Sequence, residues 1–341
     1  MKVSDFDYDL PPDFIARYPA ETRTGSKLLV FNRSDGTISH MHFHSLAEYL
    51  DEGHALIVND SKVFKARLIG NKDVTGGEVE FLCLHAVSDR TWKVLCRPAR
   101  RIKCGIKVHF GDYGNALVVE ELDGAERIVE FSDDPLVICE NAGQLPLPPY
   151  IKRQAEESDL QRYQTVYSDP VGSVAAPTAG LHFTDGLLDA IRHKGVEIVK
   201  LTLHIGWGTF RPVAVEEVRK HSVEQEWYSV DRQTADSLRR LHEAGKTLVV
   251  VGTTTTRALE SWWRDTSARL GPSSGWTDLF IYPPYRFNLV DKLVTNFHLP
   301  KSSLLMLVSA FASRESILDC YREAVDRHYR FYSYGDAMLI L

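Results

Sequence analysis

The chain has 341 residues, 44% of them hydrophobic, and a formal net charge of −6. This length and composition predict a folded protein with a large core and two domains, and the negative charge argues against a basic protein that binds nucleic acid over its whole surface. Five scattered cysteines form no C-x-x-C pair, which argues against a zinc site of thiolates and is typical of a reducing compartment.

The first predicted elements follow an α/β pattern. Strands are expected at residues 26–32 and 55–60, with a turn at 34–36 and a short helix at 45–50 between them. The opening segment, MKVSDFDYDL, carries acids where a signal peptide needs an apolar stretch, and the apolar runs fall short of the roughly 18 residues of a membrane span. We therefore expect a soluble, cytoplasmic protein.

The pattern changes between about residues 65 and 137. Short alternating segments such as EVEFLCLHAV, TWKVLCRP and RIVEF are separated by Gly, Asp and Asn turns at intervals of roughly 8–12 residues. This spacing predicts an all-β barrel or a small sandwich. The prolines of GQLPLPPY, residues 143–150, predict a stiff return linker.

After the linker, helices alternate with strands. Helices expected at 186–194 and 232–244 each end at a glycine and lead to the strands VEIVKLTLHI and KTLVVVG, which indicates parallel βα units. The simplest topology is an α/β fold in which a mixed or parallel-sheet α/β domain, residues 1–66 and 152–341, is interrupted by an inserted all-β barrel domain, residues 67–151.

Three glycine-bearing loops follow predicted strands. In HIGWGTFRPV, Gly206 and Gly208 allow a ligand close to the backbone, although a tight structural turn is the alternative, because this G-x-G lacks the rest of a dinucleotide fingerprint. In GTTTTRALES, four threonines open a helix after a strand end, where ligands sit in open α/β sheets; capping by one threonine is the alternative. GSVAAPTAGLHFT offers small residues around Pro177, which suit a cavity wall or an ordinary loop.

The hexapeptide TNFHLP, residues 295–300, precedes an apolar run. Pro300 suits the first turn of a helix, and the residues that follow leave that helix no polar face, so it should lie in a core. Asn296 and His298 would then stand at a buried helix N-terminus, where N–H groups and the helix dipole attract ligands. A loop in which both side chains bond backbone groups is the alternative.

A basic segment and a histidine cluster complete the candidates. Residues 91–110 hold six Lys or Arg and no Asp or Glu, which predicts a phosphate-binding face or, alternatively, a solvated strand face. His40, His42 and His44 have a spacing that can hold a transition metal on a strand, but an exposed polar face is the favoured interpretation. We therefore expect no metal.

Nine segments, in order over nearly the whole chain, resemble one family, the S-adenosylmethionine:tRNA ribosyltransferase-isomerases of queuosine biosynthesis. The segments are LPPDFIARYP, LIVNDSKVFKARLIG, GGEVEFL, PLPPYI, YQTVYSDPVGSVAAPTAGLHFT, LHIGWGTFRPV, VGTTTTRALES, VDKLVTNFHLPKSSLLMLVSAFA and YRFYSYGDAMLIL. The words AAPTAGLHF and TNFHLP are the most specific of them.

The resemblance implies a fold, a reaction and a partner. The fold is an α/β domain with an inserted β-barrel. The reaction moves the ribosyl part of S-adenosylmethionine, a co-substrate, onto 7-aminomethyl-7-deazaguanine at the tRNA wobble position, so that epoxyqueuosine forms while adenine and methionine leave. No metal is needed, the partner is tRNA carrying that base in its anticodon loop, and we expect a monomer that binds no membrane.

Residue types suggest roles for this chemistry. His204 and His298 titrate in the range for proton transfer, with Asp291, Glu260 and His182 in reserve. The guanidinium of Arg257 suits the methionine carboxylate, and Trp207 or Phe297 suits the sulfonium cation. The residues expected to surround S-adenosylmethionine are Pro177, Thr178, Gly180, His182, Gly206, Trp207, Gly208, Thr209, Phe210, Gly252, Thr253, Thr254, Asn296 and Phe297. The residues expected to hold RNA are Lys62, Arg67, Arg97, Arg100, Arg101 and Lys103.

Three positions depart from the family pattern. Lys27 and Lys62 stand where the family usually has arginine, and Pro284 stands where it usually has glycine. Lysine cannot copy a bidentate arginine contact, and proline cannot take the positive φ that glycine allows. These departures keep open the alternative of a catalytically silent tRNA-binding paralogue. An S-adenosylmethionine-dependent methyltransferase is a separate alternative, although the glycine loop lacks the acidic context expected of one.

Overall fold

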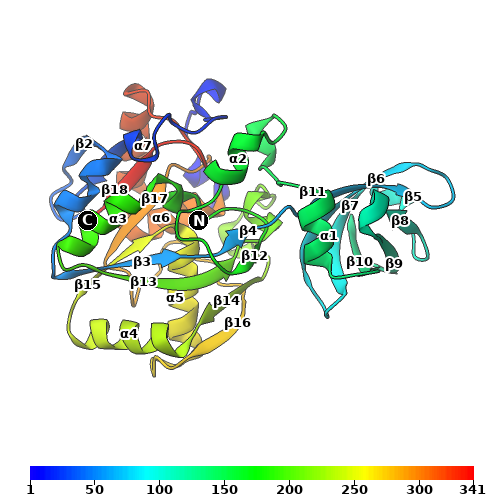
Figure 1. Ribbon diagram of the computed structural model, residues 1–341. Coiled ribbons are helices and arrows are strands. Elements are labelled where there is room, and N and C mark those ends of the chain that lie inside the picture. The colour runs from blue at the N-terminus through cyan, green and yellow to red at the C-terminus, as the bar shows by residue number, and fades with distance from the viewer.

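The chain folds into an α/β domain and a β-barrel that lies beside it, joined by two connections (Figure 1). The computed structural model describes residues 1–341, apart from the side chain of Phe210. The predicted fold class, a mixed-sheet α/β domain with an inserted barrel, is confirmed. The domain limits at 66/67 and 151/152 stay a prediction.

The α/β domain is built on a nine-stranded sheet with the order β16-β14-β13-β3-β15-β17-β18-β1-β2. Its strands are β1 Lys27–Phe31, β2 Ile38–His42, β3 His54–Asn59, β13 Glu197–His204, β14 Glu226–Val230, β15 Thr247–Val251, β16 Ser273–Thr277, β17 Lys292–Asn296 and β18 Ala337–Ile340. The four central strands β13, β3, β15 and β17 run parallel, and antiparallel strands flank them. Their carboxyl ends therefore meet at one edge of the sheet.

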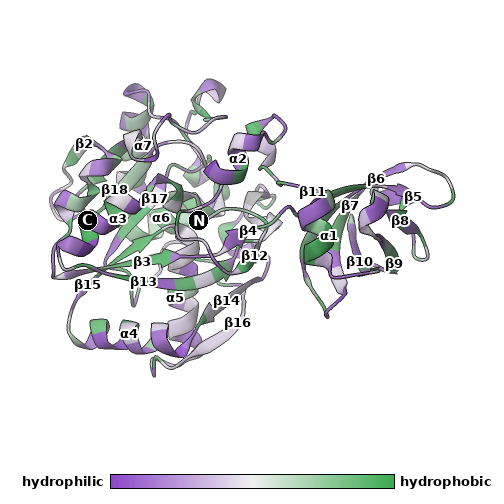
Figure 2. Ribbon diagram, viewed as in Figure 1, coloured by the Kyte–Doolittle hydropathy of each residue, from purple (hydrophilic) through white to green (hydrophobic). Residues whose placement is uncertain are grey.

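Helices cover both faces of this sheet. The α-helices are α2 Glu157–Arg162, α3 Asp185–His193, α4 Arg232–Glu243, α5 Thr253–Asp265, α6 Ser303–Ala312 and α7 Arg314–Asp326, and the barrel carries α1 Pro135–Ala142. The 3-10 helices are η1 Val3–Phe6, η2 Pro12–Phe14, η3 Arg23–Gly25, η4 Phe43–Tyr49, η5 Ala99–Arg101, η6 Gly111–Tyr113, η7 Pro149–Ile151, η8 Thr178–His182, η9 Trp207–Phe210 and η10 Val218–Lys220. Because both faces are covered, the central strands β3 and β15 are almost entirely apolar (Figure 2).

The alternation of strand side chains divides the core into two layers. In β1, Leu29 packs with the layer formed with α4, α5, α6 and α7, whereas Leu28 packs with the layer formed with η4 and α3. The helix α4 buries Ala235, Leu238 and Leu241 along one face, with charged residues on the other. The predicted helices and strands of this domain are therefore present, with their limits shifted by a residue or two.

The barrel is a separate closed sheet with its own core. Its strands are β5 Arg67–Lys72, β6 Glu78–Ala86, β7 Thr91–Arg97, β8 Lys107–His109, β9 Asn115–Glu121 and β10 Glu126–Phe131, and the pairing of β5 with β8 closes it. The returning strand β11, Gly143–Gln144, pairs with the outgoing β5. A Cβ on Gly143 would lie 2.0 Å from the Lys65 carbonyl oxygen, so only glycine allows this close crossing. Before the barrel, β4 Lys62–Val63 pairs with β12 Val171–Ser173.

Two details differ from the sequence-based expectation. The helix expected at 45–50 is the 3-10 helix η4. Pro300 was expected in the first turn of the apolar helix, but α6 begins after it, at Ser303. The Ser302 side chain caps α6 by accepting a hydrogen bond from Leu305 N. The helix itself is buried, as expected. Within the part of the chain that the structure describes, no helix has the length and apolar character needed to cross a membrane.

Candidate active site

The candidate site lies where the central parallel strands end. His204 ends β13, Gly252 follows β15, and Asn296 ends β17, so three segments far apart in sequence reach the same edge of the sheet. Ligands of open α/β sheets bind at this edge. Two neighbouring cavities occupy it, and they meet at Thr209 and Leu304.

The first, the strand-end cavity, is small and well enclosed by protein. Its free volume is about 40 Å³. Its walls are Ala176, Thr178, Ala179, Ile205, Thr209, Gly252, Thr253, Thr254, Thr295, Asn296, Phe297, His298, Leu304, Tyr332 and Ser333. The second, the arginine cavity, has a volume of about 300 Å³, and Arg257, Glu226, Gly208 and Lys220 are among its walls. The two cavities are neighbours, and each has a polar side chain in its wall, Asn296 in the first and Arg257 in the second.

Asn296 presents a free acceptor to the strand-end cavity. Its Nδ2 donates to His182 Nε2 at 3.1 Å and to the Tyr332 carbonyl oxygen at 3.2 Å. Its Oδ1 is buried and accepts no hydrogen bond from any described residue. A buried acceptor without a partner is costly, so this oxygen is suited to a ligand donor such as an amino group.

His182 supports Asn296 from behind. Its Nε2 accepts from Asn296, so its Nδ1 carries the proton and donates to Ser26 Oγ at 2.7 Å. Burial, together with the Arg23 charge, lowers the pKa of His182 to about 3. The imidazole is therefore neutral at pH 7 and serves to orient the amide.

His298 lies in the wall of the same cavity. Its Nε2 is 2.9 Å from Thr295 Oγ1, its backbone N–H donates to Tyr321 Oη at 3.0 Å, and its carbonyl oxygen accepts from Tyr8 Oη at 2.5 Å. Burial lowers the pKa of His298 to about 3. The imidazole is therefore neutral at pH 7, with one N–H and one unprotonated nitrogen, and it is not the imidazolium that would serve as an acid.

The four threonines after β15 divide into two pairs. Thr255 Oγ1 donates to the Val251 carbonyl oxygen at 2.5 Å, and Thr256 Oγ1 donates to the Gly252 carbonyl oxygen at 3.1 Å. These two complete backbone groups at the start of α5, whereas Thr253 and Thr254 line the cavity. Gly252 joins strand to helix at a φ of +92°, which favours glycine.

Arg257 in the arginine cavity is held by a buried ion pair. Its Nη1 bonds Glu226 Oε2 and its Nε donates to the Leu279 carbonyl oxygen at 3.0 Å, while the other carboxylate oxygen of Glu226 accepts from Gly206 N at 2.9 Å. The Nη2 of Arg257 is buried and donates to no residue that the structure describes. One arm of the guanidinium is thus free for an anionic ligand.

His204 lies on the other side of the 205–209 segment. It lines a third cavity, between the α/β domain and the barrel, which shares Ile205 with the strand-end cavity. Its ring stacks on Trp227 with centroids 5.2 Å apart, and a Cβ on Gly172 would lie 2.6 Å from its Nε2. Its Nδ1 is buried without a hydrogen-bond partner among the described residues, and burial lowers its pKa to about 4.

A family model described as Queuosine biosynthesis protein matches residues 3–340. The chain belongs to this family. It is 49% identical to the S-adenosylmethionine:tRNA ribosyltransferase-isomerase of Staphylococcus haemolyticus, 48% to that of a Sulfurihydrogenibium strain and 47% to that of Clostridioides difficile, in each case over 100% of both chains. The crystal structure of S-adenosylmethionine tRNA ribosyltransferase from Thermotoga maritima is similar, with a TM-score of 0.56 and 37% identity, over 99% of this chain and 100% of that one. The family inferred from the sequence motifs is confirmed.

The structure brings most residues predicted from this family to the cavities. Those in a cavity wall are Thr178, Thr209, Gly252, Thr253, Thr254, Asn296, Phe297 and His298 in the strand-end cavity, Gly208 and Arg257 in the arginine cavity, and His204, Gly206 and Trp207 in the third. The ring of Phe297 packs among Tyr321, Tyr329 and Phe331, so it belongs to the core rather than facing a cation. The side chain of Phe210 lies outside the described part of the chain.

Other predicted residues lie elsewhere. Asp291 precedes β17 at the amino end of the strand, where it is exposed and accepts a hydrogen bond from Leu248 N at 2.7 Å. Strand β17 separates it from the cavity at the carboxyl end, so we remove it from the site. Glu260 accepts four hydrogen bonds from residues 285–289, which fixes that loop and leaves it unsuited to proton transfer. Pro177 and Gly180 stand behind the wall, where Gly180 packs closely on Tyr167.

Lys27 has a structural function in this chain. Its Nζ donates to the carbonyl oxygens of Arg327 at 2.8 Å and His328 at 3.2 Å, at the carboxyl end of α7. A cation is favourable there because the helix dipole is negative at that end. The departure from the family arginine at Lys27 therefore does not touch the cavities.

The predicted histidine cluster is divided between two elements. His40 lies on β2 and its Nδ1 is 2.8 Å from Tyr329 Oη, whereas His42 and His44 stack on each other with centroids 5.8 Å apart. Among the described residues, no three His, Cys, Asp or Glu side chains gather closely enough to hold a metal ion.

Sequence reasoning missed several residues of the cavity walls, among them Thr295, Tyr332, Ser333 and Glu226. Tyr332 takes a φ of +74°, a conformation that costs a non-glycine residue about 1–3 kcal/mol. Its N–H bonds the Phe297 carbonyl oxygen at 3.0 Å, which helps to hold it there. Tyr332 and Ser333 lie in the motif YRFYSYGD, which could have indicated these two residues from the sequence.

The buried histidines predict an acid-sensitive fold. Because the folded pKa of His298 is depressed, its contribution to stability is complete above pH 6.5 and is lost as the pH falls toward 3, by about 1.4 kcal/mol per pH unit. We expect the unfolding free energy of the wild type to fall by about 2 kcal/mol more than that of His298→Gln between pH 7 and pH 5. Urea unfolding at both pH values measures this difference. Buried carboxyls such as Glu226 have the opposite effect, because burial raises the pKa of Glu226, but their effect is the same in both proteins and cancels. His193 on α3 is exposed and serves as the control. If His193→Gln differed from the wild type by the same amount, the acid sensitivity could not be attributed to the buried His298.

Proposed function

We propose that this protein transfers and isomerises the ribosyl moiety of S-adenosylmethionine onto 7-aminomethyl-7-deazaguanine at the tRNA wobble position, giving epoxyqueuosine-tRNA, adenine and methionine. The main support is the pair of neighbouring cavities, in which Asn296, with its unpaired buried acceptor Oδ1, lines one and Arg257, with its unpaired buried Nη2, lines the other. S-adenosylmethionine has a matching donor on adenine and a carboxylate on methionine.

The adenosyl part would occupy the strand-end cavity. Asn296 Oδ1 is suited to the exocyclic amino group of adenine, and the Thr253 and Thr254 hydroxyls can both donate and accept. The backbone at Gly252 lines this cavity without a side chain, and its φ of +92° favours glycine. With a volume of about 40 Å³, the cavity must widen to admit a nucleoside.

The methionine part would extend into the arginine cavity. Arg257 would hold the carboxylate with its free Nη2, while Glu226 keeps the guanidinium in place. Gly208 forms part of this wall, and a Cβ there would lie 2.5 Å from the Glu224 carboxyl group, which favours glycine. The S-adenosylmethionine molecule would thus run past Thr209, which both cavities share.

The chemistry requires a proton acceptor near the sulfonium. The sulfonium acidifies the neighbouring ribose 5′ carbon, and removal of that proton begins the rearrangement, in which adenine leaves, the carbon–sulfur bond breaks to release methionine, and the amine of the deazaguanine bonds to the sugar. His298 and His204 are both neutral at pH 7, because burial depresses each pKa, and either can accept a proton. Neither is suited to protonate the departing adenine from its resting state.

Product analysis tests this function. The purified protein is mixed with S-adenosylmethionine and tRNA carrying 7-aminomethyl-7-deazaguanine, and the products are identified by mass spectrometry. We expect adenine, methionine and epoxyqueuosine in the tRNA. S-adenosylhomocysteine would instead indicate a methyltransferase, and tRNA binding without consumption of S-adenosylmethionine would indicate a silent paralogue.

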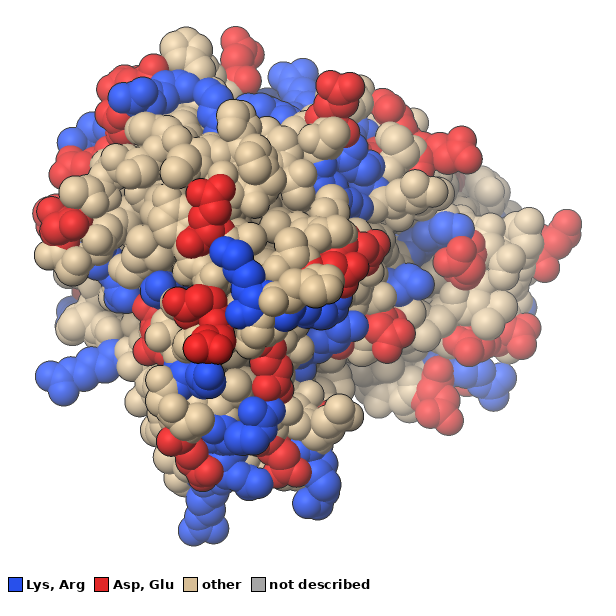
Figure 3. Space-filling model, turned by 60° about the vertical axis from the view of Figure 1, so that its left-hand side comes forward, with Lys and Arg blue, Asp and Glu red and all other residues tan. Residues whose placement is uncertain are grey.

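Basic residues of the barrel would hold the tRNA backbone. Arg97, Arg100 and Arg101 are exposed on and after β7, whereas Arg67 and Lys103 are paired with Glu80 and Glu121 at 2.7 and 2.9 Å. Over the face drawn in Figure 3, Lys and Arg are intermixed with Asp and Glu, so that face has no large region of one sign. The RNA contact would therefore be local.

Neutralising these arginines tests the contact. We expect the triple variant Arg97→Gln, Arg100→Gln, Arg101→Gln to reduce the slope of log affinity for tRNA against log salt by about 2, since each phosphate contact contributes about 0.7–0.9. Filter binding between 50 and 200 mM salt measures the slope. The matched control neutralises Arg232, Arg239 and Arg240 on α4. Equal slopes for both triple variants would remove the barrel arginines from the RNA contact.

A further inference from the structure

The third cavity, which lies between the barrel and the α/β domain, has an unusual composition. This interdomain cavity has a volume of about 980 Å³, near the upper end of the roughly 300–1,000 Å³ of small-molecule sites. Four of the six tryptophans of the chain line it: Trp92, Trp207, Trp227 and Trp276. Concentrated indole surface of this kind is suited to stacking a planar base.

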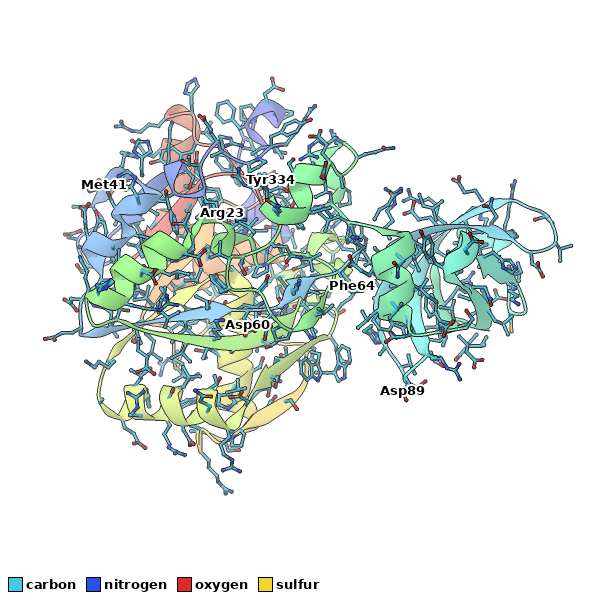
Figure 4. All side chains as sticks on the ribbon, viewed as in Figure 1. Arg23, Met41, Asp60, Phe64, Asp89 and Tyr334 are labelled. Atoms are coloured by element: carbon cyan, nitrogen blue, oxygen red, sulfur yellow. The ribbon has the colours of Figure 1, made fainter. Side chains whose placement is uncertain are left out.

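Each domain contributes part of the wall. Trp92 comes from β7 of the barrel, and Trp227 and Trp276 come from the paired strands β14 and β16 of the α/β domain. The His85 and Trp276 rings meet across the two domains with centroids 4.8 Å apart. In Figure 4, Phe64 marks the junction of the domains and Asp89 marks the β6–β7 turn, on the side of the barrel that faces the α/β domain.

The polar groups of the cavity are mainly acceptors. Glu126 and Glu224 line it, and although Lys93 lies 2.7 Å from Glu126 and Arg211 lies 2.6 Å from Glu224, each carboxylate has further lone pairs. The His204 Nδ1 atom is buried and accepts no hydrogen bond from the described residues, whereas the buried Glu224 Oε1 is ion-paired with Arg211 Nη1. A ligand donor would satisfy His204 Nδ1.

The cavity also adjoins the proposed S-adenosylmethionine site. Ile205 belongs to the walls of this cavity and of the strand-end cavity, and Glu226 belongs to the walls of this cavity and of the arginine cavity. The 205–209 segment, which contains two glycines, is therefore what separates the two sides. A group bound in the interdomain cavity needs to pass only this segment to reach the ribose.

We propose that the interdomain cavity receives the extruded wobble base, 7-aminomethyl-7-deazaguanine, stacked on the tryptophan rings with its donors directed to the carboxylates. The proposal rests on the function proposed above. The base presents adjacent N–H donors on its pairing edge and a cationic aminomethyl group, which carboxylate oxygens and indole faces both attract. A base in an anticodon loop is extruded at less cost than one in a duplex.

Paired RNA probes test the proposal. One anticodon stem-loop carries 7-aminomethyl-7-deazaguanine at the wobble position, and the other is abasic there. We expect the wild type to bind the first about tenfold or more tightly, because stacking on an aromatic side chain contributes about 1–3 kcal/mol per base. Fluorescence anisotropy of end-labelled RNA gives the ratio of the two dissociation constants.

Variants at Trp276 locate the contact. Its side chain is 43% exposed, so Trp276→Ala removes little buried contact, and circular dichroism checks that the variant is folded. We expect Trp276→Ala to bring the ratio close to one, Trp276→Phe to keep most of it, and Trp263→Ala, a control on α5 that is not in the cavity wall, to keep all of it. A ratio near one in the wild type, or an unchanged ratio in Trp276→Ala, overturns the proposal. Adenine release by the wild type is measured separately. Failure of the proposed function can therefore be distinguished from failure of the proposed base-binding site.

Discussion

Replacing His298 by glutamine is expected to lower the turnover of S-adenosylmethionine by at least about a hundredfold, the usual scale of general acid–base catalysis. His204→Gln is expected to have an effect of the same size. Both imidazoles are neutral at pH 7, and glutamine keeps the polarity of each site but cannot accept the proton. Adenine release at saturating S-adenosylmethionine and tRNA measures the turnover.

The two variants also distinguish the roles of the two histidines. His298 Nε2 is engaged with Thr295 in the strand-end cavity, whereas His204 Nδ1 is free in the interdomain cavity. Loss of turnover in His298→Gln with normal tRNA affinity would assign the proton transfer to His298. Near-normal turnover in both variants, with the fold intact by circular dichroism, would show that neither side chain acts in the chemistry. His193→Gln is the control.

The second large effect concerns stability. Arg257→Met is expected to lower the free energy of unfolding by about 3–5 kcal/mol, because it leaves the buried Glu226 carboxylate without its cation. Adding Glu226→Gln should restore part of the loss, since the neutral amide is less costly to bury. Urea unfolding of the single and double variants measures both values.

An exposed pair provides the control for this experiment. Arg240 Nη2 lies 2.7 Å from Glu197 Oε2, but both side chains are largely solvated, so Arg240→Met should cost less than about 1 kcal/mol. If Arg257→Met were no more destabilising than Arg240→Met, the buried pair would not be what holds Gly206 and the 205–209 segment in place. The Arg257 variant should also raise the KM for S-adenosylmethionine.

The sequence predicted the loops of the site better than the side chains that act in them. Gly206, Gly252 and Asn296 each follow a strand, and since the carboxyl ends of parallel strands share one edge, their convergence could be expected. Asp291 shows the limit of this reasoning. It lies only five residues before Asn296, but the whole of β17 stands between them, so they are at opposite ends of the sheet.

Partners of buried groups could not be read from the sequence. Glu226 lies on an antiparallel strand 31 positions before Arg257, and nothing in VEQEWYSV distinguishes it from Glu224. The same holds for the interdomain cavity. Trp92 and Trp276 are 184 positions apart, and only the placement of the barrel beside β16 brings them together. Such contacts depend on domain packing, which local patterns do not encode.

The crossing of β5 and β11 at Gly143 has an evolutionary consequence. The insertion enters and leaves through hydrogen-bonded neighbours, and none of its strands belongs to the nine-stranded sheet. A lengthened or shortened outer hairpin therefore alters neither the register of that sheet nor the ends of its strands. Descendants of such a protein can therefore vary the outer surface of this appendage while the strand ends that line the strand-end cavity are inherited unchanged.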